Sequence, residues 1–441
     1  TEKHGRISCV PSTEEKYKCF TVGSIKFLDS LAFMSSSLEK LAANLYDNGK
    51  GIGNMYHTKS LFKDIGLQHM DLLMKKQVYP YDWASEEHMN SQLPLPKESF
   101  FSTMTDSDIS DKLYQNHIKV CEVLNLKIFK EYHDLYLKLD VCLLADVFET
   151  FRRTCIGNYK LDPCFYITLS SYSWDVMLNR TRVEIERLTD QDMYLFFESS
   201  KRGGLSSVLS KKHVEANNQY LPEGLYDKNK ETSFLTYLDA NNLYGKSMQM
   251  SLPLNNFQWM NATDDELILE QNDCTYLLDD LLKDYTDEST VGYTFEVDMN
   301  LPDKYHDLQS DYPLGPTNTT IEYSEMSENQ QELLKKIHLD RFNTTIDALI
   351  SNESNEEAKR KLIKRKDKYK FKIPKQSSKL VATLKPKTNY IVNIGYLKTM
   401  IEYGWVVTKV SRGISYNQSK WLSEYINLNT QLRTMASNDF E

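Results

Sequence analysis

The chain lacks several features that mark specialised classes of protein. None of its 7 cysteines belongs to a Cys-x-x-Cys pair, which argues against a zinc module of paired cysteines and against a disulfide framework. No apolar run is long enough to span a bilayer, and no signal-peptide pattern is present. The sequence therefore predicts a reduced intracellular protein with no membrane partner.

The chain also has fewer positively charged than negatively charged residues. The 62 acidic residues outnumber the 53 Lys and Arg residues, for a formal net charge of −9, which argues against a protein that coats polyanions with its whole surface. A local basic channel and metal-binding carboxylates are compatible with that balance. With 441 residues, 40% of them hydrophobic and 26% charged, the chain has a globular composition and is too long for one ordinary domain.

Hydrophobic periodicity predicts both strands and helices. Strand signals occur over 18–29 and 290–298, and helical signals occur over 35–45, 107–152, 174–200, 327–350 and 417–436. Strands and a helix alternate over 388–416. We therefore predict a mixed α/β (α+β) fold without internal repeats.

The most informative segment is Tyr237-Leu-Asp-Ala-Asn-Asn-Leu-Tyr-Gly245. An apolar run ends on Asp239, a polar turn follows, and Tyr244 comes just after that turn. We expect a strand that ends at Asp239, because the strand fixes the carboxylate while the turn exposes backbone amides, an arrangement that suits a metal-bound triphosphate. An Asp that ends a strand through an Asx-turn is the alternative interpretation.

A second informative pattern is Tyr136-Leu-Lys-Leu-Asp140. On a helix, residues four apart share one face, so we expect the Tyr136 hydroxyl and the Asp140 carboxylate to lie side by side. A tyrosine hydroxyl next to a metal-bound carboxylate can orient an attacking water. An amphipathic helix with a surface aspartate is the alternative.

The segment around Asp239 resembles motif A of family B DNA polymerases, in the protein-primed branch of organellar, viral and self-synthesising transposon enzymes. Asn242 and Gly245 stand where the usual Asp-x-x-Ser-Leu-Tyr-Pro motif has Ser and Pro. The resemblance implies that Asp239 binds both catalytic metal ions and that Tyr244 screens out ribonucleotides. It also implies that the triphosphate is bound by the backbone of four residues, Ala240, Asn241, Asn242 and Leu243.

Three segments that precede motif A resemble exonuclease motifs of the same family, in the family's order. Tyr136 and Asp140 match the third exonuclease motif, which implies a catalytic role for both and a metal-binding role for Asp140. Ser30-Leu31 resembles the motif that binds the single-stranded primer end. Lys76 resembles the lysine that stabilises developing phosphate charge, and a surface lysine is the alternative.

Two further features resemble nucleic-acid contacts. The run Lys201-Arg202-Gly203-Gly204 resembles the Tyr-x-Gly-Gly motif that contacts the template backbone, with Lys201 in place of the Tyr. The glycines allow a close approach of the main chain to phosphates. Residues 359–375 interleave lysines and arginines with Tyr369 and Phe371, a mixture that suits phosphates and bases. A helix-ending turn and a solvated lysine-rich helix are the respective alternatives.

The resemblance divides the chain into four segments. It implies an RNase H-like 3′–5′ exonuclease domain over 1–190, the start of a polymerase palm over 191–260, an insertion like the terminal-protein region over 261–385, and a palm segment leading to motif B over 386–441. Motifs B and C and the first two exonuclease motifs are not found, so each active site is expected to keep one of its carboxylates. We interpret the chain as a fragment that is inactive by itself.

The implied reaction is nucleotidyl transfer by a DNA-directed DNA polymerase, from a dNTP to a primer 3′-hydroxyl or to a hydroxyl of a terminal (priming) protein. The implied cofactor is Mg²⁺ or Mn²⁺, and the implied partners include primer-template and single-stranded DNA. A nuclease-only protein that depends on Asp140 and a non-catalytic single-stranded DNA-binding replication accessory are the alternatives. The nucleus, the mitochondrion and a viral replication site are equally compatible.

Overall fold

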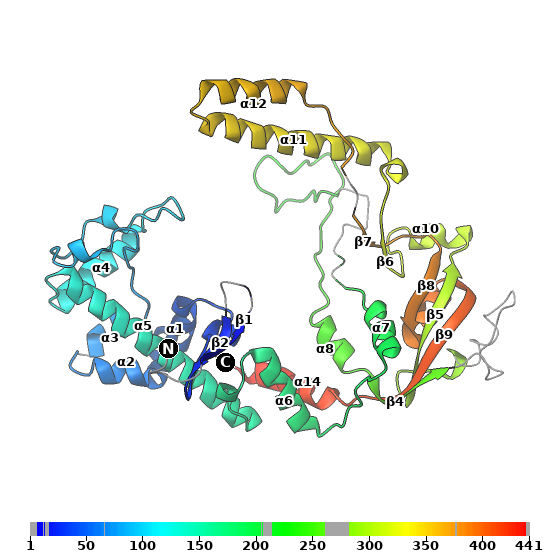
Figure 1. The fold of residues 1–441 in the computed structure, drawn as a ribbon, viewed down its shortest axis with the longest axis horizontal. Coiled ribbons are helices and arrows are strands. Elements are labelled where there is room, and N and C mark those ends of the chain that lie inside the picture. The colour runs from blue at the N-terminus through cyan, green and yellow to red at the C-terminus, as the bar shows by residue number, and fades with distance from the viewer. Residues whose placement is uncertain are drawn as a thin grey trace. The chain divides into compact units, whose positions relative to one another are not determined.

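The computed structural model describes residues 7–11, 13, 17–65, 67–203, 205, 214–260, 282–374 and 377–437. The chain divides into two compact units: Thr1–Val183 together with Trp421–Glu441, and Glu184–Lys420. Helices and antiparallel strand pairs occur in both units (Figure 1). The expected mixed α/β (α+β) fold is therefore confirmed.

The first unit combines a small sheet with seven α-helices in its described part. Its strands, in the order β1-β2-β3, are β1 (Ile7–Pro11), β2 (Tyr17–Val22) and β3 (Ile25–Leu28). Its α-helices are α1 (Leu38–Tyr46), α2 (Tyr56–Leu61), α3 (Leu67–Leu73), α4 (Asp111–Val123), α5 (Phe129–Tyr159), α6 (Leu169–Thr181) and α14 (Ser423–Met435). Its 3-10 helices are η1 (Ser30–Ala32), η2 (Asp47–Asn54), η3 (Glu86–His88), η4 (Lys97–Phe100) and η5 (Pro163–Phe165).

The core of the first unit forms around α5. Its apolar residues recur every three or four positions, so Leu135, Leu139 and Leu143 fall on one face, and all three are buried. Helices α1 and α2 pack against this helix. The burial of one face holds α5 in place along its length, which fixes the direction of every side chain on its other faces.

A buried carboxylate joins α2 to α5. Asp146, only 1% exposed, accepts hydrogen bonds from His57 N (2.7 Å), Thr58 N (3.0 Å) and Thr58 Oγ1 (2.7 Å). These amides belong to the first turn of α2, where N–H groups have no partner within the helix and a negative charge is favoured. Asp146 therefore fixes the beginning of α2 on α5.

The second unit is built on a four-stranded antiparallel sheet in the order β4-β9-β5-β8. Its strands are β4 (Leu252–Met260), β5 (Val291–Asn300), β8 (Lys387–Asn393) and β9 (Val406–Ser419), with a separate pair β6 (Thr317–Thr319) and β7 (Lys379–Val381). Its described helices are α7 (Gln191–Ser200), α8 (Leu243–Met248), η6 (Asp303–Tyr305), α10 (His306–Gln309), η7 (Tyr323–Glu325), α11 (Glu328–Asn352), α12 (Glu356–Lys368) and α13 (Ile394–Glu402).

Alternation along the strands divides the core of this unit between the two faces of the sheet. On β8, Val392 packs with Leu397 of α13, whereas its neighbour Ile391 packs with Phe196 of α7. Successive strand residues point to opposite faces, so α13 covers one face and α7 covers the other. The residues that follow α7, beginning with Lys201, are thereby held next to β8.

The sheet contains strands from segments that the sequence assigned to different domains. Strand β4 belongs to the expected palm start, β5 to the expected insertion 261–385, and β8 and β9 to the expected segment 386–441. Because β5 pairs with both β8 and β9, the expected insertion does not form a body apart from the strands around it. The functional names of the four segments stay predictions.

The end of the chain also departs from the expected division. Helix α14 is grouped with the first unit, where Arg180 Nε lies 2.9 Å from Glu424 Oε1 and the Tyr159 hydroxyl donates to Asn429 Oδ1 at 2.6 Å. The segment 386–441, expected to be a palm segment leading to motif B, therefore contributes to both units.

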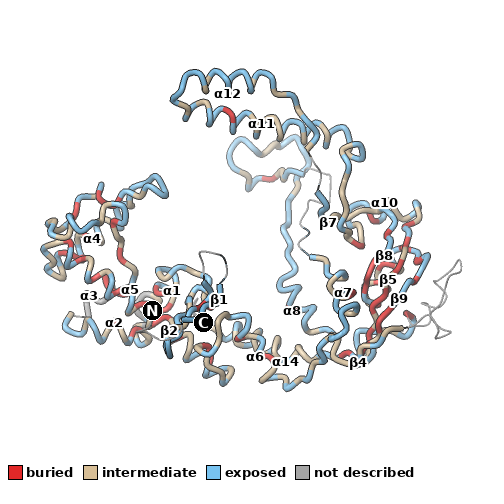
Figure 2. Tube along the Cα trace, viewed as in Figure 1, coloured by how far each residue is buried: buried red, intermediate tan, exposed pale blue. Residues whose placement is uncertain are grey.

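Burial differs sharply between elements. Figure 2 shows buried residues collected along α5 in the first unit and along β5, β8 and β9 in the second. Most of α11, α12 and the segment 234–242 is exposed. No helix in the described part of the chain is both long enough and apolar enough to cross a membrane.

Candidate functional site

The first unit brings together a lysine and an aspartate that lie far apart in the sequence. Lys76 Nζ is 3.6 Å from Asp140 Oδ2 and 5.9 Å from the ring centre of Tyr136. Tyr136 and Asp140 lie one turn apart on α5, as their spacing predicts. Lys76 comes from the segment after α3. We call Lys76, Tyr79, Tyr81, Tyr136 and Asp140 the Asp140 cluster.

Two tyrosines hold Tyr136 in position. The hydroxyls of Tyr81 and Tyr136 are 2.6 Å apart, and the rings of Tyr79 and Tyr136 are 4.6 Å apart. Burial raises the pKa of Tyr136, and the Tyr81 hydrogen bond and the Asp140 charge raise it further. The Tyr136 hydroxyl therefore keeps its proton at neutral pH and is able to donate a hydrogen bond.

One oxygen of Asp140 is available to coordinate a metal ion. Oδ1 is buried and has no hydrogen-bond partner among the described residues, a condition that costs free energy for a carboxylate. A divalent cation would satisfy this oxygen. In the described part of the chain, however, no three His, Cys, Asp or Glu side chains gather into a metal-binding group. Asp140 thus fits the role of one metal ligand and does not make a complete site.

The predicted primer-end motif is anchored to the same helix. Ser30 and Leu31 form η1, which begins where the Asp29 carboxylate accepts a hydrogen bond from Leu31 N at 3.0 Å. Leu31 is exposed, and Phe33 packs on Phe148 of α5, with ring centres 6.0 Å apart. Asp29 is therefore a helix cap, and Ser30 and Leu31 are held on the surface through Phe33.

The expected strand before Asp239 is not formed. Residues 234–240 belong to no helix or strand and are all exposed, with Tyr237 92% exposed. The prediction of a strand end at Asp239 is therefore wrong for this structure. The apolar run has strand composition, but such a segment forms a strand only where a neighbouring backbone pairs with it through hydrogen bonds.

The predicted nucleotide-binding residues follow this open segment and share its exposure. Ala240, Asn241, Asn242 and Leu243 are all exposed, and Tyr244 is 80% exposed. They form a turn and the beginning of α8. The structure thus places the six residues from Asp239 to Tyr244 on the surface of the second unit.

The two departures from the motif A pattern are physically coupled. Asn242 has a left-handed backbone (φ 57°) and caps α8, with its Oδ1 accepting from Gly245 N at 3.1 Å. A Cβ at position 245 would lie 2.2 Å from Asn242 Nδ2. Proline there has no N–H to donate and carries a Cβ, so the Asn242 cap requires the glycine.

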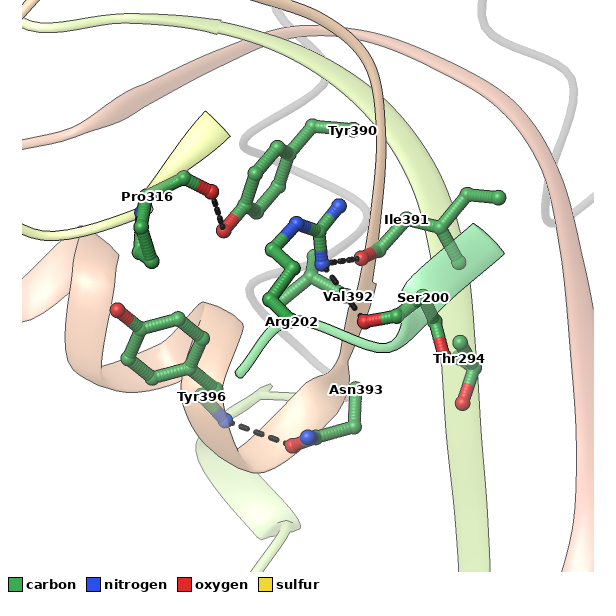
Figure 3. A pocket seen from close by; sticks show the side chains of 9 residues that line it. All are labelled: Ser200, Arg202, Thr294, Pro316, Tyr390, Ile391, Val392, Asn393 and Tyr396. Carbon is green, nitrogen blue, oxygen red and sulfur yellow. Dashed lines mark hydrogen bonds between the residues drawn. The ribbon is translucent and has the colours of Figure 1, made fainter. Parts of the chain in front are cut away.

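Arg202 is packed into the second unit at the exit of α7 (Figure 3). Its guanidinium carbon lies 3.7 Å from the ring centre of Tyr390, and its Nη1 donates to Ser200 O at 3.0 Å and Ile391 O at 2.6 Å. A Cβ added to Gly203 would meet nothing within 4 Å, so its backbone is open to approach. Gly204 lies outside the described residues.

The aromatic residues of the basic run are used inside the fold. Tyr369 stacks on Phe342 of α11 with ring centres 3.7 Å apart, and Phe371 lies 6.1 Å from the ring of His338. Residues 359–368 of the run belong to α12, which Lys366 also joins to Asp347 of α11 through an ion pair of 2.6 Å, and Tyr369 and Phe371 follow the helix. Among its described residues, the rings hold α11 and α12 together, while most of the cations face solvent. Position 375 lies outside the described residues.

Sequence reasoning missed Asp146, Lys387 and Tyr390. A signal for Asp146 existed, because an aspartate within the apolar run Leu143-Leu-Ala-Asp-Val147 is a polar residue at a core position. Tyr390 gains its importance from packing with α13 and beside Arg202, and Lys387 from its burial over the Trp405 ring, which no local pattern shows.

Comparisons with family models, with curated proteins and with solved structures find no match to this chain. The geometry of its own residues therefore carries the functional argument.

Proposed function

We propose that this chain is part of a DNA polymerase of family B, in the protein-primed branch. In this proposal the first unit belongs to an RNase H-like 3′–5′ exonuclease domain, and the second contains part of the palm with its insertion. The observation that carries the proposal is the proximity of Lys76 Nζ and Asp140 Oδ2, at 3.6 Å. The two residues belong to separate motifs, and nothing in the motif patterns alone requires that they meet.

The Asp140 cluster has the chemistry that hydrolysis of a phosphodiester needs. Asp140 Oδ1 offers a ligand to a divalent ion, the Tyr136 hydroxyl donates a hydrogen bond that can orient water, and the Lys76 ammonium offsets negative charge that develops on phosphate. Mg²⁺ or Mn²⁺, when bound, would supply the activation of the attacking water. Leu31, exposed, and Ser30, half-buried, follow the end of β3 and suit the proposed contact with a single-stranded primer.

The polymerase role rests on the segment from Asp239 to Tyr244. Its exposure leaves the carboxylate, the turn amides and the Tyr244 ring open to a dNTP. Within the described residues Asp239 belongs to no group of three or more His, Cys, Asp or Glu side chains that could hold a metal ion. We therefore expect no primer extension from the 441 residues alone. Primer extension by the purified chain that disappears in Asp239→Ala would contradict this expectation.

Mn²⁺ titration of the purified chain tests the exonuclease half without requiring activity. Asp140→Asn should weaken Mn²⁺ binding about tenfold, because a charged ligand is replaced by a neutral one. Asp134→Asn is the matched control, since Asp134 is an exposed aspartate of the same helix. Equal Mn²⁺ binding by the wild type and Asp140→Asn would remove the support for an exonuclease site.

One alternative function is favoured by a specific observation. The Asp140 cluster is assembled, whereas Asp239 stands on an open segment, as in a nuclease that does not polymerise. Metal-dependent cleavage of single-stranded DNA that Asp140→Asn abolishes and Asp239→Ala leaves intact would establish that function. Salt-sensitive DNA binding without metal dependence would instead indicate a non-catalytic replication accessory.

A further inference from the structure

A cavity of the second unit lies between the exit of α7, the strand β8 and the beginning of α13 (Figure 3). Its volume is about 290 Å³, and its lining includes Arg202, Tyr390, Asn393 and Tyr396. Ligand pockets span roughly 300–1,000 Å³, so this cavity is at the small end. It has room for a phosphate group and the atoms next to it rather than for a whole nucleotide.

Arg202 lines this cavity and carries N–H donors that no described residue accepts. An arginine carries five N–H donors, and the recorded bonds to Ser200 O and Ile391 O both leave from Nη1. Nε and Nη2 have no acceptor among the described residues. The stacking on Tyr390 and the two backbone hydrogen bonds hold the guanidinium plane in one orientation. Nε and Nη2 are therefore preorganised to donate two parallel hydrogen bonds.

A second cation lies close to the first. Lys387 is only 2% exposed, and its Nζ donates to Thr383 O at 2.9 Å and Thr383 Oγ1 at 3.2 Å. Burial, together with the nearby charge of Arg202, lowers the pKa of Lys387 to about 8. Lys387 therefore stays mostly protonated at pH 7 and adds positive potential to the cavity, although it does not line it.

The two cations have no acidic partner in the described part of the chain. Burial also lowers the pKa of Arg202, and the only groups that act against this shift are the hydroxyls of Tyr390 and Tyr396. Two like charges that are desolvated together without a counter-charge raise the free energy of the fold. A bound anion would offset that cost.

Two polar groups at the rim can add hydrogen bonds. The Tyr396 hydroxyl accepts from Gly315 N at 3.0 Å, which leaves its own hydrogen available. Asn393 Oδ1 accepts from Tyr396 N at 2.9 Å, and Asn393 is exposed. The cavity therefore offers further donors beside the guanidinium fork, and those donors suit an acceptor-rich ligand.

We propose that this cavity binds a dianionic phosphate group, free or as a phosphomonoester, with the open edge of the Arg202 guanidinium as its principal contact and Lys387 as the second charge. Two cations match the charge of a phosphomonoester, about −1.5 to −2 at pH 7, better than the single charge of a phosphodiester. The planar arginine fork fits two phosphate oxygens. The ligand is either free phosphate or the 5′-phosphate of a nucleic acid strand. The proposal does not rest on the polymerase function.

Binding of inorganic phosphate and of two oligothymidylates by the purified chain tests the proposal. One oligonucleotide carries a 5′-phosphate and the other a 5′-hydroxyl. If the ligand is the 5′-phosphate of a nucleic acid strand, the phosphorylated oligonucleotide should bind about tenfold more tightly than the other, and inorganic phosphate should compete with it. Binding of inorganic phosphate without this preference identifies free phosphate as the ligand. Absence of both effects overturns the proposal.

Variants locate the site. Arg202→Gln should weaken binding of the preferred ligand about tenfold, and Arg202→Lys should retain part of the affinity because it keeps the charge but loses the fork. Arg412→Gln is the control, since Arg412 lies on β9 of the same sheet, pairs with Glu296 and does not line the cavity. Unchanged binding in both Arg202 variants would overturn the assignment.

The pH dependence of phosphate affinity, compared between the wild type and Lys387→Met, tests the role of Lys387. A purely structural role of Arg202 would not produce such a dependence. Wild-type affinity should fall several-fold between pH 7.5 and 9.5 as Lys387, with a pKa of about 8, loses its proton. In Lys387→Met the affinity at pH 7.5 should be reduced by a similar factor and should stay constant over this range. A pH dependence that persists in Lys387→Met would exclude Lys387 as the second charge.

Discussion

The surroundings of Asp140 and of Asp239 differ in almost every physical respect. Asp140 lies on a helix whose opposite face is buried, and Lys76 and Tyr136 are arranged around it. Asp239 lies in a segment without helix or strand, where every residue from Phe234 to Asn242 is exposed. Both aspartates come from motifs that resemble the same polymerase family.

This difference shows what a functional motif requires beyond its own residues. The spacing of Tyr136 and Asp140 needs only a helix to place them on one face. The motif around Asp239 needs a strand, and a strand needs a neighbouring backbone to form its ladder. The first motif therefore takes its geometry from local structure, whereas the second depends on partners that lie elsewhere.

The largest expected difference concerns backbone protection. Amides of 136–140 should exchange with solvent at least about 10³-fold more slowly than those of 234–240, because the former are bonded within a packed helix and the latter are open. Hydrogen exchange with mass spectrometry measures this ratio. Chymotrypsin should also cut first at Phe234, Tyr237 or Leu238. Equal protection of the two segments would show that 234–240 is paired in solution.

The support beneath the Asp140 cluster should be broken by Asp146→Ala. Removing this carboxylate leaves the buried donors of His57 N, Thr58 N and Thr58 Oγ1 without an acceptor, which should cost about 4 kcal/mol of unfolding free energy. Urea unfolding followed by exchange of α5 peptides measures the loss. Asp134→Ala, at an exposed position of the same helix, should change stability by less than about 0.5 kcal/mol.

Acid should weaken the first unit through His117. Burial lowers the pKa of His117 from 6.5 to about 4, and its Nε2 accepts from Leu95 N at 3.3 Å, so the folded state holds the ring neutral. Cys121 and Tyr132 face this ring. The unfolded state binds the extra proton first, so stability should fall by roughly 3 kcal/mol as the pH falls from 6.5 to 4.

The acid effect is measured by unfolding the chain in urea across this pH range. His117→Gln removes the titrating group and should flatten the dependence, although it lowers stability at pH 7. Lys387 provides the same dependence at alkaline pH in the second unit, because its lowered pKa predicts that stability rises between pH 8 and 10.5. An unchanged acid dependence in His117→Gln would show that other groups cause it.

The smallest expected effect lies beside Asp239. Asn242→Ala removes the cap of α8 and should reduce the local stability of that helix by about 1 kcal/mol. Gly245→Ala should disturb the same cap, because its methyl group would occupy the position of the Asn242 side chain. Exchange of residues 243–248 should increase about fivefold in either variant, while α5 is unaffected. Additive effects in the double variant would show that the two positions are independent.

Much of the local structure could be predicted from sequence. The helical spacing of Tyr136 and Asp140, the strand over 290–298 and the helix over 327–350 all follow from periodicity, and the structure contains β5 and α11 at the latter two places. The sequence also shows the basic run and predicts that its aromatic residues suit nucleic acid bases. In the structure Tyr369 instead stacks on Phe342 of α11. Periodicity reports which face is apolar and does not report what covers that face.

The sequence by itself determined the mixed α/β composition, the positions of most helices and the face shared by Tyr136 and Asp140, because these depend on residues within a few turns of one another. Only the tertiary structure decided that Lys76 meets Asp140, that Arg202 lines a cavity and interacts electrostatically with Lys387, and that 234–240 stays unpaired. These outcomes depend on contacts between distant segments, whose free energy no local pattern contains.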